Sequence, residues 1–153
     1  MNIEHLSSFL KVAKKNTYAS ESAKKVESQR LKSKDYEYSE GNFLYHDTYF
    51  GGTNFIGEEI VYENDNPVWG MNYNGYVLDK NVTEVEIDKS LRGALKQDSG
   101  DLIPVRGPKY YKVENLEYKN KIEGDLTKFE GKEEVYKDNK LIYSALFHGG
   151  LIS

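Results

Sequence analysis

The sequence predicts an α+β protein in which two helix-plus-antiparallel-meander repeats form a curved sheet with both helices on one face. Three observations predict this class. Apolar residues recur at three- and four-residue steps in two segments, alternate with period two through most of the remainder, and are interrupted by glycine- and asparagine-rich turns. The length of 153 residues favours a single domain over 1–153. Two smaller sheets packed face to face are the alternative arrangement.

Two segments have the apolar periodicity of helices. The first covers 2–15, with Asn2 as an acceptable N-cap. The second covers 86–97, with Asp88 as the expected cap and Gly100 just beyond its end. Their apolar faces consist of Ile3, Leu6, Leu10 and Ala13 in the first helix and of Ile87, Leu91, Ala94 and Leu95 in the second.

Strands are expected in the period-two regions, with seven or eight strands in the sheet. Residues 16–34 are rich in serine and lysine and predict a loop that can hold a short strand at 25–27. The alternation starts at Asp35, and the expected strands after it cover 43–49, 55–62, 68–73, 110–113, 115–122, 129–136 and 141–147. Residues 64–67 predict a turn, and the glycine pairs at 51–52 and 149–150 are expected to end strands.

The second half of the sequence looks like a copy of the first. Residues 55–75 align on 129–149 without a gap, and the alignment matches phenylalanine, glycine, glutamate and valine-tyrosine positions. We therefore expect an internal repeat of about 2–78 and 86–152. The alternative is that two β-hairpins share residue types because both need the same turns.

Composition excludes several classes of function. Lysine and arginine total 21 against 25 acidic residues, a formal charge of −4, which argues against nucleic acid as a direct partner. The absence of cysteine excludes disulfides, thiolate zinc sites and cysteine nucleophiles. No apolar run approaches the ~18 residues of a membrane helix, so we expect a cytoplasmic protein without a membrane partner. The three histidines do not cluster at metal-ligand spacing, and no cofactor or metal is expected.

Parity predicts that acidic side chains face the core. Glu59 and Glu133 each share a strand face with phenylalanine and valine, and Asp47 shares one with tyrosines. A buried carboxylate costs several kcal/mol unless it is paired, and its pKa rises, as in general acids and bases. The alternative is a β-bulge at Gly57 or Gly131, which would turn both glutamates to solvent.

Arg106 stands in a rigid Arg-Gly-Pro segment of a chain with only 3 arginines. An ion pair with Asp47, Glu59 or Glu133 would make Arg106 structural, whereas a free guanidinium would contact an anion. Aromatic strand faces either fill a half-exposed sheet or line a concavity for a flat or sugar-like ligand. The candidate ligand-binding residues are Tyr18, Asp47, Tyr49, Glu59, Trp69, Asn72, Tyr73, Arg106, Glu133 and His148.

Several longer motifs carry a resemblance to a known family. They include TYAS at 17–20, LYHDTYFGGTNFIGEEIVY at 44–62, NPVWGMNYNG at 66–75 and FEGKEEVY at 129–136. These motifs resemble an uncharacterised bacterial domain family whose members occur alone or C-terminal to a helix-turn-helix of the xenobiotic-response-element type. The resemblance implies a sensor-like or ligand-binding role and supplies no chemistry.

Together these observations predict a non-enzymatic domain that binds a small molecule or another protein in the concavity of its sheet. One alternative is a small acid–base enzyme that uses Asp47, Glu59 and Glu133, with Arg106 orienting an anionic substrate. The other is an oligomerisation module whose tyrosine-rich face forms a homodimer interface.

Overall fold

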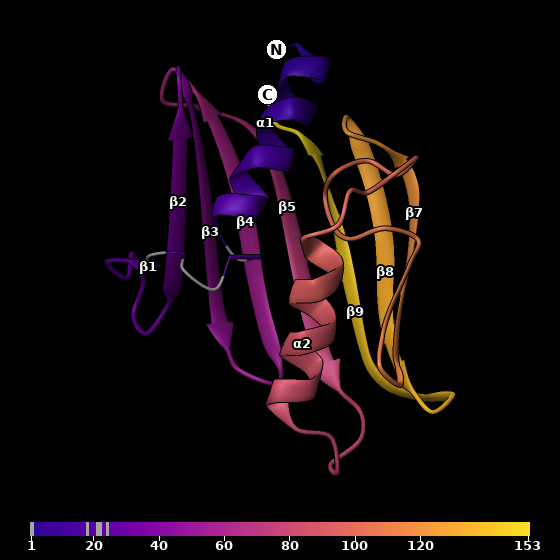
Figure 1. Ribbon diagram of the computed structural model, residues 1–153. Helices are drawn as coiled ribbons and strands as arrows, with labels where there is room; N and C mark the ends of the chain where they lie inside the picture. Colours follow the sequence, from indigo (N-terminus) through magenta and orange to yellow (C-terminus); the bar gives the residue numbers. More distant parts are fainter. Residues whose placement is uncertain (1, 18, 21–22, 24) are drawn as a thin grey trace.

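The structure is a computed structural model that describes residues 2–17, 19–20, 23 and 25–153. Within these residues it contains two helices and one nine-stranded antiparallel sheet, so the predicted α+β class is confirmed (Figure 1). The strand order is β1-β2-β3-β4-β5-β9-β8-β7-β6. The strand bounds are β1 Lys25–Val26, β2 Lys34–Glu40, β3 Phe43–Gly51, β4 Phe55–Glu63, β5 Asn66–Val77, β6 Tyr110–Val113, β7 Leu116–Asp125, β8 Lys128–Lys137 and β9 Lys140–Leu151.

The central pair β5 and β9 joins the two halves of the chain into one sheet. These strands lie side by side in the middle of the sheet (Figure 1), with the Cα of Tyr73 opposite that of Phe147. The alternative of two separate sheets is therefore wrong for the described residues. The strand β9 also continues to Leu151, so the glycine pair at 149–150 lies inside a strand instead of ending it.

Helix α1, Ile3–Asn16, begins where the sequence predicted. The side chain of Asn2 accepts a hydrogen bond from the His5 backbone N–H, which satisfies one of the unpaired donors of the first turn. The apolar side of the helix packs against aromatic side chains of β3. It consists of Leu6, Phe9, Leu10 and Ala13, all buried.

Helix α2, Glu84–Leu95, has a different N-cap from the one expected. Thr83 and Glu86 form a capping box in which each side chain accepts from the other residue's backbone N–H. The expected cap, Asp88, lies in the second turn, because the helix already begins at Glu84, after the N-cap Thr83. The buried side of α2 packs against β7, β8 and β9 through Ile87, Leu91 and Ala94.

Gly57 in β4 and Gly131 in β8 allow an aromatic side chain of the neighbouring strand to pack against the backbone. The alternative of a β-bulge at these two glycines is wrong. A Cβ on Gly57 would lie 2.4 Å from the Tyr73 hydroxyl, and one on Gly131 would lie 2.3 Å from the Phe147 ring. The register shifts instead between Val61 and Tyr62 and between 135 and 136. Glu59 and Glu133 precede these shifts and keep the inward parity that the sequence predicted.

The capping box makes Thr83 a testable determinant of α2. We expect Thr83→Ala to lower the free energy of unfolding by about 1 kcal/mol, because the Glu86 backbone N–H loses its acceptor. Urea titration followed by circular dichroism measures this change. Asp88→Ala is the matched control on the same helix and leaves the cap intact; an equal loss in both variants would contradict the assignment.

Candidate functional site

The inner face of the sheet buries carboxyl groups from both halves of the chain. Glu59 is 4% exposed and Glu133 is 0% exposed, which confirms the predicted inward orientation of both side chains. Glu59 lies on β4 and Glu133 on β8, and the two side chains have different surroundings. The difference between these surroundings defines the candidate site.

Glu133 is held in a complete hydrogen-bonded ion pair. Arg106 donates from Nε to Oε2 over 3.0 Å and from Nη2 to Oε1, so its planar fork grips both oxygens. The hydroxyls of Tyr118 and Tyr143 donate to the same carboxylate over 2.8 and 3.2 Å. Burial alone would raise the pKa of Glu133, but the charge of Arg106 and these donors outweigh it and lower the pKa. Arg106 is thus structural, as one of the two sequence interpretations held.

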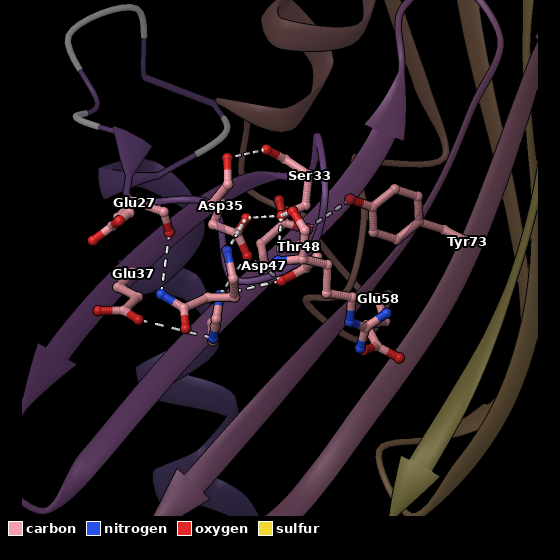
Figure 2. A network of polar contacts seen from close by, with 12 residues as sticks. Glu27, Ser33, Asp35, Glu37, Asp47, Thr48, Glu58 and Tyr73 are labelled. Atoms are coloured by element: carbon pink, nitrogen blue, oxygen red, sulfur yellow. Dashed lines mark hydrogen bonds and ion pairs between the residues drawn. The ribbon is translucent and has the colours of Figure 1, made fainter.

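Glu59 and Asp47 form a buried carboxyl pair without such an arginine. Their Cα atoms are partners across β3 and β4, so both side chains stand on the inner face next to each other. The Tyr73 hydroxyl donates to Asp47 Oδ1 over 2.6 Å and is turned toward it in Figure 2. Tyr45 hydrogen-bonds to Glu59, while Oε2 of Glu59 is buried without a hydrogen-bond partner among the described residues.

Lys14 of α1, which the sequence analysis missed, supplies a positive charge that lowers the pKa of Glu59. Its ammonium nitrogen is buried and has no hydrogen-bond partner in the described part of the chain. Burial lowers the pKa of Lys14 to about 8, against the opposing effect of Glu59. A signal was present in the sequence, because position 14 lies eight residues after Leu6, on the same side of the helix.

The carboxyl pair has raised pKa values. Burial, followed by the negative charge of Glu59, raises the pKa of Asp47 to about 8. Burial also raises the pKa of Glu59, although Lys14 and Arg106 oppose the rise. Two like charges so close in a low-dielectric interior do not both ionise cheaply, so the pair holds a proton at neutral pH.

A cavity of about 170 Å³ opens beside this pair, between α2 and strands β3, β4 and β5. Its buried lining includes Asp47, Glu59, Tyr73 and Arg106. Apolar side chains from β4 and α2 form part of the wall: Phe55, Ile87 and Leu91. The more exposed lining carries both signs of charge: Lys25, Lys34, Glu84, Asp88 and Arg92. The cavity therefore has a polar, acid-rich inner end and a mixed outer end.

The structure brings half of the predicted candidates to this cavity. Those that line it are Asp47, Tyr49, Glu59, Tyr73 and Arg106. Glu133 lies behind Arg106, and Trp69 is 0% exposed in the core, where its indole N–H donates to the Leu126 carbonyl. Asn72 and His148 are Cα partners on the opposite face of the sheet and do not reach the cavity. Tyr18 lies outside the described residues.

A second polar network lies on the outer face and is built around Asp35 (Figure 2). Its carboxylate accepts from Ser33, Thr48 and the Gln29 backbone, and it contacts His46 Nε2 at 2.9 Å. Burial would raise the pKa of Asp35, but these donors lower it to about 2. The network attaches the segment before β2 to the sheet and leaves its own polar groups satisfied, so we assign it a structural role.

Metal ligation has no support in the residues that the structure describes, since these bring together no group of three or more potential ligands. No helix of that part of the chain is long and apolar enough to cross a membrane.

The fold and site define an α+β protein with a buried acidic pair at the inner end of a small cavity. Residues 47–152 match a family model described as a domain of unknown function, DUF5680, and the chain belongs to this family. The match covers β4 to β9 and both inward glutamates. Searches of curated proteins and of solved structures gave no match.

The ion pair of Glu133 predicts a large effect of its neutralisation. We expect Glu133→Gln to lower the free energy of unfolding by about 3–5 kcal/mol, because Arg106 would remain buried without its anion. Thermal or urea unfolding checks this expectation. Glu134→Gln, which removes an outward carboxylate paired with Lys132, should cost less than about 1 kcal/mol. Similar losses in both variants would refute the structural role.

The raised pKa of Asp47 predicts the sign of a pH effect. Between the unfolded value of 3.8 and about 8, the folded protein retains a proton that the unfolded chain has lost. Stability from this group therefore falls as pH rises, by up to about 1.4 kcal/mol per pH unit. We expect Asp47→Asn to gain stability relative to the parent from pH 5 to pH 8, whereas Glu58→Gln keeps the parent's pH profile. A constant difference between Asp47→Asn and the parent over this range would show that Asp47 ionises normally.

Proposed function

We propose that the protein is a non-enzymatic domain that binds a small molecule in the cavity between α2 and strands β3 to β5. The observation that carries the proposal is the buried carboxyl pair of Asp47 and Glu59 on the cavity wall. Burying carboxyl groups without a counter-ion lowers the stability of the folded protein. A ligand that forms hydrogen bonds or an ion pair with them would raise that stability again. Binding sites commonly combine an apolar wall with a few convergent polar groups, as this cavity does.

The dimensions of the cavity favour a small ligand over a protein partner. A cavity of about 150 Å³ can hold benzene, so about 170 Å³ holds a molecule of roughly one ring or a short chain. The tyrosines Tyr45 and Tyr73, which the homodimer alternative needed at a surface, are buried within the chain. This burial favours a ligand enclosed by one chain.

Acid–base catalysis is the second candidate, and it rests on the proximity of Asp47 and Glu59. One protonated and one ionised carboxyl side by side can donate and accept a proton. Glu133 would not take part, because it is saturated by hydrogen bonds and does not line the cavity. Conversion of a bound molecule, lost in Asp47→Asn, would favour this candidate; unchanged recovery of the molecule favours the binding domain.

We also propose that the two halves arose by duplication, which gives a sheet with both helices on one face. The register shifts after Val61 and after Val135 are separated by the same offset that aligns 55–75 on 129–149. The left-handed turn residues 64–65 and 138–139 keep this offset as well. Tyr73 and Phe147, which the alignment also makes equivalent, face each other across β5 and β9, as residues at a two-fold axis would.

Blocking the cavity tests the binding proposal. We expect fragments of about 6–12 heavy atoms to raise the unfolding temperature of the parent protein and to lose this effect in Thr53→Trp. Thr53 is exposed and lines the cavity, so a larger side chain there closes it without disturbing the core.

Lys121→Trp is the matched control, because Lys121 is exposed and does not line this cavity. Differential scanning fluorimetry measures all three proteins. Fragments that act equally on all three, or no stabilising fragment at all, would contradict the proposal.

A further inference from the structure

We propose that the ligand of this cavity is a small organic monocation, a primary ammonium or a guanidinium, held between Asp47 and Glu59. This inference rests on the proposed function and adds the charge and chemical class of the ligand. It follows from a count of the buried charges, from their pairing, and from what lines the cavity.

The buried cluster is one positive charge short. Among the described residues it contains three carboxyl groups, of Asp47, Glu59 and Glu133, and only two cationic groups, of Lys14 and Arg106. With every group ionised, the sum is −1. A low-dielectric interior penalises such an excess charge, so an additional cation or a proton must balance it.

The missing charge belongs next to Asp47. Arg106 is committed to Glu133 through two donors of its guanidinium, and Lys14 enters from α1 beside Glu59. Asp47 receives the hydroxyl of Tyr73, a neutral donor. Burial and the charge of Glu59 raise the pKa of Asp47 more than the charge of Arg106 lowers it, so Arg106, which is hydrogen-bonded to Glu133, compensates Asp47 only in part.

The other half of the chain supplies an internal comparison. Asn120 stands opposite Glu133 on the ladder between β7 and β8, just as Asp47 stands opposite Glu59 between β3 and β4. Glu133 is fully paired, and the residue across from it, Asn120, is a neutral amide that donates to the Gly107 carbonyl over 2.7 Å. The ionisable carboxyl of Asp47 therefore distinguishes the half that adjoins the cavity.

The cavity offers the rest of what an organic cation needs. Glu59 Oε2, buried and without a partner among the described residues, can accept an N–H bond from a ligand placed beside Asp47. Phe55, Ile87 and Leu91 can cover a short carbon body. A metal cation is disfavoured, since Ca²⁺ or Mg²⁺ takes about six or more oxygen ligands and the described residues bring no three potential ligands together.

In the unliganded protein a proton on Asp47 compensates the excess negative charge of the buried cluster. A monocation that takes its place must release that proton, so binding and proton release are coupled. Below about pH 8 the affinity for the cation should rise about tenfold for each unit by which the pH increases.

Isothermal titration calorimetry with n-butylammonium and guanidinium chloride tests the inference, with n-butanol and butyrate as neutral and anionic probes. We expect the cations alone to bind, with release of about one proton at pH 6.5 and almost none at pH 9, measured in two buffers of different ionisation enthalpy.

Asp47→Asn should weaken cation binding at least tenfold and abolish proton release, while Glu58→Gln on the outer face leaves both unchanged. Because Asn120 occupies the corresponding place in the other half, asparagine at 47 should be accommodated, and circular dichroism verifies folding.

The outcomes separate the two proposals. If n-butanol or butyrate binds as well as the cations, and Thr53→Trp abolishes that binding, the cavity binds ligands but the cation inference is wrong. Cation binding without proton release, or binding unaffected by Asp47→Asn, also overturns the inference. If Thr53→Trp changes the binding of none of the four probes, the binding proposal loses its support together with the inference.

Discussion

The bidentate pair between Arg106 and Glu133 determines what the other buried charges can do. It consumes the arginine of the cluster and satisfies one glutamate completely, with two tyrosine hydroxyls completing the shell. Within the described part of the chain, the ammonium of Lys14 is then the only buried cation near Asp47 and Glu59 that is not already hydrogen-bonded to a carboxylate. Their altered ionisation is a consequence of this unequal distribution of charge, and it would change if Arg106 had another partner.

Glu59 and Glu133 differ in the residues that lie across from them and next to them on the inner face. Phe147 takes the place of Tyr73 when 129–149 is aligned on 55–75, and Asn120 lies across from Glu133 as Asp47 lies across from Glu59. The hydroxyl and the carboxyl are thus absent together from one half and bonded to each other in the other half. The Arg106 guanidinium lies over the Tyr73 ring, 5.7 Å from its centroid. The ion pair of Arg106 and Glu133 therefore adjoins the tyrosine that donates to Asp47. The carboxylate of Glu133 is thus saturated with donors, whereas Glu59 keeps one buried oxygen without a partner among the described residues.

The sequence was sufficient to predict which face of the sheet Glu59 and Glu133 lie on, but not which residues of other elements contact them. Period-two parity was sufficient to turn Glu59 and Glu133 inward, because one buried face determines the register of a strand. Parity could not predict that Arg106 pairs with Glu133, because this contact depends on where the loop between α2 and β6 packs. Lys14 was missed because a lysine in the last turn of a helix is usually solvated. The aromatic character of Trp69 predicted a ligand contact, yet its indole N–H found a backbone carbonyl in the core.

The central position of the β5–β9 ladder has a consequence for synthesis of the chain. Tyr73 and its partner Phe147 stand in different halves of the sequence, so one edge of β5 stays unpaired until the last strand has left the ribosome. During that interval the nascent first half exposes a strand edge in the middle of its future sheet, where it can pair with another nascent chain. Long-range ladders of this kind form slowly, because the chain between them must first be ordered. The first half therefore completes its part of the sheet only after β9 has been synthesised.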